Sequence, residues 1–244
     1  MSLPDAARLM RVVEATWPAA ATRACGPCTL RDGQCGGSRV SAATLFGTAT
    51  RDQIAEAAAA MRAMGQPALF QVRAGQEGFD AELAALGYAE KDATVLYAAP
   101  VEAIATQRPP PITSFEVWPL LEVQREIWAD GGIGPARLAV MARAAGPKTT
   151  LLGRIDERPA GTAYVAIAEG CAMIHALEIA ADARRRGLAR HLTRGAAFWA
   201  RDNGADFLTL VTTRANKAAN ALYASLGMTL VGGYHYRILN EAPT

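Results

Sequence analysis

An arginine-rich segment carries the clearest indication of chemistry in this sequence. It follows a short apolar run, residues 173–179, which predicts a buried strand. After Gly187 the apolar residues recur every three to four positions, which predicts a helix that begins at this glycine. The first turn of a helix has unpaired backbone N–H groups and a partial positive charge, so it attracts phosphate. The segment therefore predicts a phosphate cradle, made of Arg184, Arg185, Arg186, Gly187, Leu188, Ala189 and Arg190.

A second polar segment lies downstream, one predicted helix and one predicted strand after the first. Asn216 stands just before a helical run and suits the N-cap position, where it can also contact a ligand. Tyr223 lies within that run, between Leu222 and Leu226. From its position on the apolar face of that run, the tyrosine ring suits the core.

Together the two segments resemble the signatures of the GNAT superfamily of N-acetyltransferases. The pattern Arg184-x-x-Gly187-x-Ala189 matches R/Q-x-x-G-x-G/A. Residues 216–228 are similar to N-x-x-A-x-x-L-Y-x-x-x-G-F, with methionine at the last position. The resemblance implies acetyl-CoA as cosubstrate, no metal, and further cosubstrate contacts beside the cradle from Leu177, Glu178, Ile179, Asn216, Ala219 and Tyr223.

Acetyl transfer to an amine needs a base for the amine, donors for the developing oxyanion and an acid for the departing thiolate. The resemblance implies a backbone N–H within residues 177–179 as oxyanion donor and Tyr223 as acid. Three candidates for the base stay open: His175, Glu178 and a chain of water molecules. The segment from His175 to Leu177 resembles that of arylalkylamine acetyltransferases, but a histidine amid apolar neighbours also suits a core position. Strand alternation predicts that His175 and Glu178 lie on opposite faces.

The composition is that of an ordinary globular protein. Of 244 residues, 51% are apolar and 20% are charged, so the chain can bury a sizeable core. The net charge of +2, without a block of basic and aromatic residues, gives no indication of nucleic-acid binding. No apolar run approaches the roughly 20 residues of a membrane span, and the first residues lack a secretory pattern. We therefore expect a cytoplasmic protein without nucleic-acid or membrane partners.

The cysteines allow two interpretations. Four cysteines in 244 residues do not make a disulfide framework, so free thiols are expected. Cys25 and Cys28 flank a Gly-Pro pair, and Cys35 follows seven residues later, a spacing that invites a zinc interpretation. A closed zinc site needs four ligands, and neither a histidine nor a fourth cysteine stands nearby. Buried thiols beside a Gly-Pro turn are therefore the favoured interpretation.

Hydrophobic periods and turn residues predict the remaining elements. Residues 79–88 echo residues 219–228, which indicates that the N-terminal part is a degenerate repeat lacking both signatures; an unrelated α+β lid is the alternative. The prolines at 109–111 predict an extended linker. Helices are expected over 5–17, 51–64, 77–86, 117–129 and 137–144, and strands over 68–72, 88–99, 149–155, 162–167, 172–179, 207–212 and 229–238.

The expected fold class is α/β (α+β): a GNAT-like mixed, mostly antiparallel sheet flanked by helices, with a smaller related N-terminal α/β domain. The predicted domains are a degenerate GNAT-like domain over 1–104, a linker over 105–112 and an acetyltransferase domain over 113–244. The expected function is acetyl-CoA-dependent, direct acetylation of a primary amine of a small molecule or peptide, by a monomer or homodimer. The alternatives are a non-catalytic acetyl-CoA-binding regulatory protein and a protein whose arginines bind another phosphorylated ligand.

Overall fold

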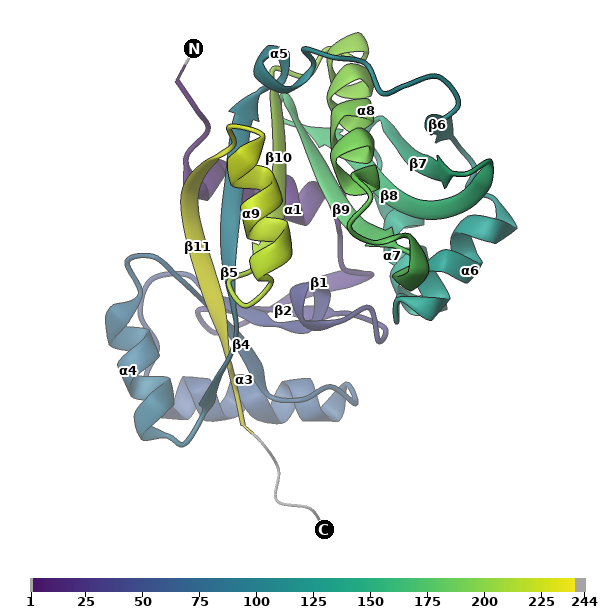
Figure 1. The fold of residues 1–244 in the computed structure, drawn as a ribbon. Helices are drawn as coiled ribbons and strands as arrows, with labels where there is room; N and C mark the ends of the chain where they lie inside the picture. Colours follow the sequence, from purple (N-terminus) through teal and green to yellow (C-terminus); the bar gives the residue numbers. More distant parts are fainter. Residues whose placement is uncertain (1, 240–244) are drawn as a thin grey trace. The chain divides into compact units, whose positions relative to one another are not determined.

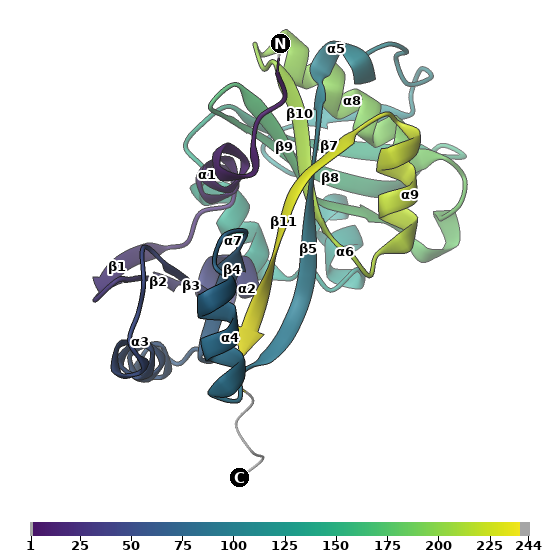
Figure 2. The same ribbon diagram turned by 90° about the vertical axis from the view of Figure 1, so that its left-hand side faces the viewer.

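The computed structural model describes residues 2–239, and the chain divides into two units, each assembled from separate stretches (Figures 1 and 2). The larger unit holds the residues up to Pro18 together with 96–212 and 216–231. The smaller unit holds residues 19–95, 213–215 and those from Gly232 onward. Two long strands, β5 (Ala89–Pro100) and β11 (Thr229–Ile238), contribute residues to both units.

This grouping differs from the predicted ranges 1–104 and 113–244 in two respects. The first helix, α1 (Ala6–Thr16), belongs to the larger unit because it packs on strands of that unit. The last strand, β11, passes from the larger unit into the smaller one, where its final residues pair with β4 (Leu69–Arg73). That one part is a repeat of the other stays a prediction.

The larger unit is built on a sheet with the strand order β11-β5-β10-β9-β8-β7-β6. Its middle is an antiparallel meander of β7 (Lys148–Ile155), β8 (Arg158–Ala168) and β9 (Cys171–Ile179), and β6 (Ser114–Val117) pairs antiparallel with β7. β10 (Phe207–Thr213) lies parallel to β9, and helix α8 (Leu188–Asp202) connects the two. The mixed, mostly antiparallel sheet predicted from the sequence is thereby confirmed.

Helices cover both faces of this sheet. On one face lie α1, α6 (Glu122–Asp130) and α7 (Pro135–Arg143); Gln124 of α6 donates a hydrogen bond to the Thr162 hydroxyl of β8 over 3.0 Å. The neighbouring Gly161 faces the other side, because a Cβ atom placed there would meet Leu188 of α8 at 3.1 Å. Figures 1 and 2 show α9 (Lys217–Ser225) on the same side as α8, with α1 on the opposite side.

The strands of the smaller unit are mixed in direction and follow the order β1-β2-β3-β4-β11-β5. β1 (Ala21–Cys25), β2 (Cys28–Asp32) and β3 (Ala43–Leu45) are antiparallel, β4 is parallel to β3, and β11 is antiparallel to β4. A short helix, α2 (Ser38–Ser41), precedes β3. Helices α3 (Arg51–Ala63) and α4 (Glu77–Ala85) contribute to one buried apolar cluster with these strands, which includes Leu30, Phe70 and Phe79.

Most predicted elements are present, but three regions differ from the prediction. Residues 117–121 are not helical: β6 ends at Val117, Pro119 follows, and α6 begins only at Glu122. The hairpin of β1 and β2 was not predicted, because apolar and polar residues alternate too little along its two short strands. Immediately before the predicted linker, residues 101–104 form a short helix, α5 (Val101–Ile104), which was not predicted either.

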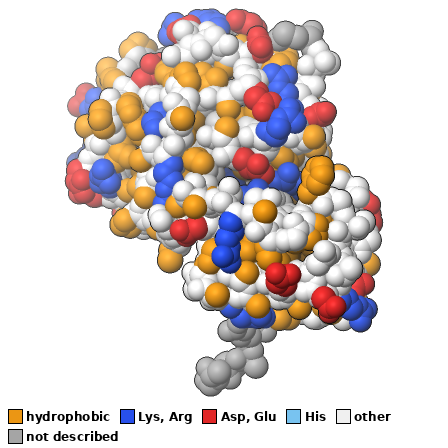
Figure 3. All heavy atoms as spheres, turned by 180° about the vertical axis from the view of Figure 1, so that it is seen from behind, with side chains coloured by type: hydrophobic (Ala, Val, Ile, Leu, Met, Phe, Trp, Pro, Cys, Tyr) orange, Lys and Arg blue, Asp and Glu red, His pale blue; other side chains and the backbone are white. Residues whose placement is uncertain are grey.

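Charged side chains of both signs are spread over the molecular face drawn in Figure 3, where basic and acidic groups are interspersed. In the part of the chain that the structure describes, no group of three or more His, Cys, Asp or Glu side chains is arranged to hold a metal ion.

None of the helices within residues 2–239 has the length and apolar character needed to cross a membrane.

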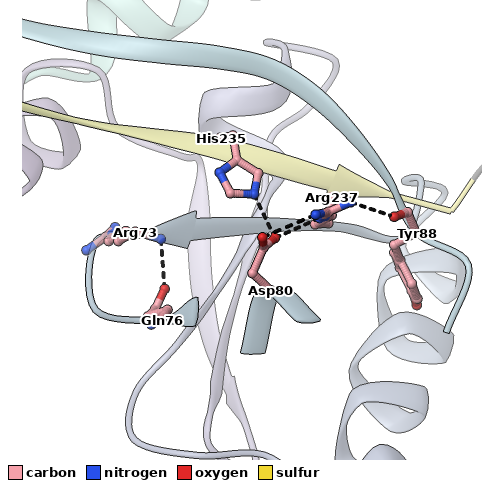
Figure 4. Close-up of polar contacts among 6 residues, drawn as sticks. All are labelled: Arg73, Gln76, Asp80, Tyr88, His235 and Arg237. Carbon is pink, nitrogen blue, oxygen red and sulfur yellow. Dashed lines mark hydrogen bonds and ion pairs between the residues drawn. The ribbon is translucent and has the colours of Figure 1, made fainter. Parts of the chain in front are cut away.

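A charged cluster fastens helix α4 to β11 in the smaller unit (Figure 4). Asp80 of α4 accepts two hydrogen bonds from the Arg237 guanidinium, at 2.7 and 3.1 Å, and contacts His235 Nε2 at 2.7 Å. Arg237 also donates to the Tyr88 carbonyl at 3.2 Å. The hydrogen bond from Arg237 is the main reason why the pKa of Asp80 lies below its ordinary value. The carboxylate is therefore bound in its charged form.

This cluster predicts a pH-dependent stability. Because the folded-state pKa of Asp80 is lowered, the charged carboxylate stabilises the fold above the ordinary pKa of 3.8, and this contribution is lost as the pH falls through the folded-state pKa. We expect Asp80→Asn to lower the free energy of unfolding by about 1 to 3 kcal/mol at pH 7. The difference from the parent protein should shrink below about pH 4, as measured by urea unfolding.

Asp92→Asn is the matched control, since Asp92 is exposed, pairs only with Lys91 at 3.4 Å and has a backbone conformation that asparagine tolerates. It should change stability little at either pH. An Asp80→Asn protein that is destabilised equally at pH 3 and pH 7 would contradict a role for the charge.

Candidate functional site

The predicted cradle is a strand-to-helix turn in the larger unit. After β9 the chain makes a short 3-10 turn, Ala181–Ala183, and enters α8 at Gly187, whose φ of +84° is the left-handed conformation that glycine adopts without strain. A Cβ atom at Gly187 would meet nothing within 4 Å, so the approach to the backbone is open. Arg190 is the first residue whose N–H bonds back into the helix, to the Gly187 carbonyl at 3.0 Å. The preceding N–H groups are thus available for an anion.

The four arginines of the cradle have different surroundings. Arg184 pairs with Glu178 at 3.1 Å, and Arg190 donates to the Ser225 hydroxyl of α9 at 2.8 Å. Arg186 forms a two-pronged pair with Asp156, at 2.9 and 3.1 Å. Across the described residues, the Arg185 side chain forms neither an ion pair nor a hydrogen bond. The cation most available to a ligand is therefore Arg185.

A β-bulge in β9 determines what lies beside the cradle. Tyr164 of β8 pairs with His175, and Thr162 pairs with Glu178, so two residues of β8 span the same length as three of β9. The extra residue lies around Ala176, whose φ is +49°. The Trp128 indole N–H of α6 donates to the Ala176 carbonyl at 2.7 Å and holds the bulge.

The bulge corrects the prediction that His175 and Glu178 lie on opposite faces. Cross-strand partners point to the same side, and Thr162 and Tyr164 share one face of β8 because they are two residues apart. Their partners Glu178 and His175 therefore share that face as well, toward α1, α6 and α7. The alternation rule failed because it presumes a strand without an inserted residue.

Beyond the bulge, β9 separates from β10 and a cavity opens. The parallel pairing of these strands ends at Ile174 and Leu210, although both strands continue. The cavity has a volume of about 730 Å³ and is bounded by the diverging strands, the cradle and α9. This volume is within the range of small-molecule sites. The sequence-predicted residues that line it are His175, Leu177, Glu178, Ile179, Arg184, Arg185, Gly187, Leu188, Ala189, Arg190, Asn216, Ala219 and Tyr223.

The residues that line the cavity differ in part from the site residues that the sequence predicted. Arg186, predicted as a cradle residue, does not line the cavity, because its side chain pairs with Asp156 instead. The wall formed by Leu210, Val211 and Thr212 of β10 was missed. A sequence signal for this wall exists. The predicted order of a strand at 172–179, a helix after Gly187 and a strand at 207–212 favours parallel pairing, and ligands bind at the carboxyl ends of parallel strands.

His175 lines the cavity, but most of its side chain is enclosed by neighbouring residues. It is 3% exposed, stacks on Trp17 with ring centres 5.0 Å apart, and lies 6.0 Å from the Tyr164 ring. Its Nε2 is 2.8 Å from the Thr16 hydroxyl, which donates its single proton to the Val12 carbonyl at 2.7 Å. With the hydroxyl proton on the Val12 carbonyl, the matching neutral tautomer of His175 has its proton on Nε2 and leaves Nδ1 unprotonated.

Glu178 occupies a more open position. Its side chain is about one-fifth exposed and pairs with Arg184. It lines the large cavity and also a neighbouring hollow of about 290 Å³, which Asp130, Gly131 and Asp182 help to form. Glu178 is thus a carboxylate that reaches both spaces.

Tyr223 lies at the cavity wall in helix α9. The side chain of Asn216 accepts from the Ala219 N–H at 3.1 Å and caps this helix, as predicted from the sequence. Tyr223 is 6% exposed, and its ring centre is 5.9 Å from that of Tyr97. Burial raises the pKa of the Tyr223 hydroxyl to about 12. The hydroxyl therefore keeps its proton throughout the neutral and mildly alkaline range.

Comparisons with known proteins agree on one fold. Residues 112–228 match the sequence model described as the acetyltransferase (GNAT) family. The chain is similar in structure to a GCN5-related N-acetyltransferase from Kribbella flavida, with a TM-score of 0.71, 20% identity and coverage of 97% of this chain and 96% of that one. No curated protein matches the sequence.

Two further solved structures are similar over nearly the whole chain. One is a conserved protein of unknown function from Staphylococcus epidermidis ATCC 12228, with a TM-score of 0.70, 10% identity and coverage of 96% of this chain and 98% of that one. The other is a tandem GNAT protein from the clavulanic acid biosynthesis pathway, with a TM-score of 0.58, 15% identity and coverage of 97% and 88%. At these identities the likeness establishes the fold alone.

The two central arginines of the cradle allow a matched test of where phosphate binds. Arg185→Gln and Arg186→Gln each remove one charge, but only Arg185 lines the cavity. We expect Arg185→Gln to weaken CoA binding by about ten- to a hundredfold, the value of a hydrogen bond to a charged group. Arg186→Gln should change it by less than about threefold. Calorimetric titration checks this, and equal losses in the two variants would contradict the assignment.

Proposed function

We propose, from the match of residues 112–228 to the sequence model of the acetyltransferase (GNAT) family, that this protein transfers an acetyl group from acetyl-CoA directly to a primary amine of a small molecule or peptide. The observation that carries the proposal is the open strand-to-helix cradle beside a cavity between two diverging strands. The same cavity reaches three side-chain or backbone groups that the chemistry needs.

The residues around the cavity fit acetyl-CoA. The open first turn of α8 and the side chain of Arg185 suit a pyrophosphate, and the apolar residues Leu177 and Leu210 suit the pantetheine chain. When bound, acetyl-CoA supplies an activated acetyl group whose leaving thiolate is stable enough to depart. The protein need only position this group, exclude water and move two protons.

The bulged stretch of β9 can supply a backbone donor for the developing oxyanion. The N–H of Ala180 donates to the Ala160 carbonyl of β8 at 2.9 Å. Because successive N–H groups of a strand point in opposite directions, the N–H of Ile179 points away from β8, toward the side where β10 has diverged. A fixed backbone dipole in this position stabilises negative charge without reorganising. By the same alternation the N–H of Leu177 points that way as well, so Leu177 and Ile179 are the two candidates for this donor within residues 177–179.

Tyr223 is the proposed acid for the departing thiolate. Its hydroxyl belongs to a residue that lines the cavity, and its raised pKa keeps the proton in place until negative charge develops nearby. The ring also packs against Tyr97, so the side chain combines both roles that the sequence left open.

Glu178 is the proposed base, acting directly or through a water molecule. Its carboxylate lines both the cavity and the neighbouring hollow, from which an amine can approach. His175 is less suited to take the proton because its side chain is only 3% exposed and its ring is packed between Trp17 and Tyr164. We assign His175 a positioning role, as a buried link between β9 and α1.

The proposal is tested by mixing the protein with acetyl-CoA and a panel of primary amines and measuring the free thiol of CoA. Some amines should release thiol faster than the control without amine. Acetyl-CoA alone should also stabilise the fold, by about 2.7 kcal/mol at a hundredfold excess over its dissociation constant. Gly187→Glu should abolish both effects, because a carboxylate at the cradle repels phosphate. Stabilisation without any turnover would favour a regulatory acetyl-CoA-binding protein instead.

The role of Tyr223 is tested with a change that preserves its ring. Tyr223→Phe should lower turnover by about a hundredfold, the lower end of the usual effect of general acid catalysis. Acetyl-CoA affinity and melting temperature should stay close to those of the parent. Tyr97→Phe is the control, since it removes a nearby hydroxyl that bonds to Asn220 at 3.1 Å and does not line the cavity. Parental turnover in Tyr223→Phe, with chemistry shown to be rate-limiting, would remove Tyr223 from the mechanism.

A further inference from the structure

Two cysteines of the smaller unit face each other across a tight turn and take no part in the proposed acetyl transfer. Cys25 ends β1 and Cys28 begins β2, and the two are direct cross-strand partners. Direct partners in an antiparallel pair have Cα atoms about 4.5 to 5.5 Å apart. A disulfide requires Cα atoms about 4.4 to 6.8 Å apart. The hairpin therefore holds the two cysteines within the separation that a disulfide needs.

The turn between the cysteines is restrained by its own two residues, by a hydrogen bond to its backbone and by strand pairing with β3. Gly26 has a φ of +53°, which suits the first central position of a two-residue hairpin turn, and Pro27 restricts the second position. The Pro27 carbonyl accepts a hydrogen bond from the Phe46 N–H at 2.9 Å. Cys28 is also paired with Leu45 of β3 on its other side. The separation of the cysteines is thus set by the fold and not by a flexible loop.

The two thiols differ in their access to solvent. Cys25 is partly exposed, whereas Cys28 is 1% exposed and belongs to the apolar cluster beneath α3. Burial raises the pKa of the Cys28 thiol to about 11, and the charge of Cys25 adds to this rise, which means that the two sulfur atoms are close together. Cys25 is therefore the thiol that an external reagent reaches first, and Cys28 is the neighbour that can resolve the product.

We propose that Cys25 and Cys28 form a reversible intrachain disulfide by exchange with a low-molecular-weight disulfide such as oxidised glutathione. In the first step the Cys25 thiolate attacks one sulfur of the reagent, forms a mixed disulfide and releases one glutathione thiolate. In the second step the Cys28 sulfur loses its proton, attacks Cys25 and releases the second glutathione. The two cysteines are oxidised by two electrons, and the reagent is reduced to two thiols.

The other cysteines are internal references for this reaction. Cys35 is exposed and lies beyond Asp32, at the opposite end of β2 from the Gly-Pro turn. Cys171 is buried in β9 of the larger unit. Cys35 thus reports how strongly the reagent modifies an exposed thiol without a partner across a turn.

The sequence makes the test direct. Trypsin cuts after arginine, so one peptide, residues 24–31, contains both Cys25 and Cys28, and the next, residues 32–39, contains Cys35 alone. The full chain is equilibrated in mixtures of reduced and oxidised glutathione, its remaining thiols are alkylated in acid, and the peptides are weighed by mass spectrometry. The expected product is peptide 24–31 without alkyl groups and lighter by two hydrogen atoms, while Cys35 carries glutathione or an alkyl group.

Two variants test the order of steps. In Cys28→Ser the glutathione adduct at Cys25 should accumulate, because the resolving thiol is absent, whereas in the parent this adduct should be lost as the disulfide forms. Cys35→Ser should leave the disulfide fraction of peptide 24–31 unchanged. Equal adduct at Cys25 in Cys28→Ser and in the parent would overturn the proposal. So would alkylation of both cysteines in mixtures that modify Cys35.

A final comparison tests the role of the hairpin. The disulfide fraction of peptide 24–31 should be smaller when the same mixtures are applied in concentrated urea, where no strand pairing holds the cysteines together. A fraction that is equal or larger in urea would show that the fold does not favour the bond. Neither this comparison nor the variants depend on acetyl transfer.

Discussion

The site depends on one hydrogen bond, from the Trp128 indole to the Ala176 carbonyl. A residue other than glycine rarely adopts the positive φ of Ala176 unless its surroundings hold it there. Trp128 is fully buried and cannot move without disturbing the packing of α6, so it is a rigid anchor. Because this hydrogen bond holds the bulge in place, β9 diverges from β10 and no longer pairs with it beyond Ile174. The backbone of residues 177–179 is then free of a strand partner on that side, and the cavity opens there.

The sequence was sufficient where the structural signal is local. The change from strand to helix at Gly187 follows from hydrophobic period alone, and the cap by Asn216 follows from residue type. The bulge could not be predicted in this way, because the inserted residue around Ala176 is an ordinary alanine in an apolar run. A single inserted residue moves every later side chain of the strand to the opposite face. For this reason the prediction that His175 and Glu178 lie on opposite faces was wrong.

The surroundings of His175 illustrate a second limit of the sequence. The residues that enclose it, Thr16 and Trp17, come from the other end of the chain, more than 150 positions away. Nothing in their local pattern connects them with β9, and the predicted boundary assigned them to a different domain. The contribution of β11 to both units escaped prediction for the same reason, since strand pairing is a long-range property.

The shared strand β11 has a consequence for synthesis on the ribosome. Residues 19–95 are synthesised more than 130 positions before β11, the strand that pairs with β4. Helix α1 is likewise synthesised well before β8 and β9, on which it packs. Until residues 229–238 have been synthesised, β4 presents an unpaired edge on that side, which is a template for pairing with other chains. The sheet of the smaller unit therefore cannot be completed during synthesis before β11 has left the ribosome.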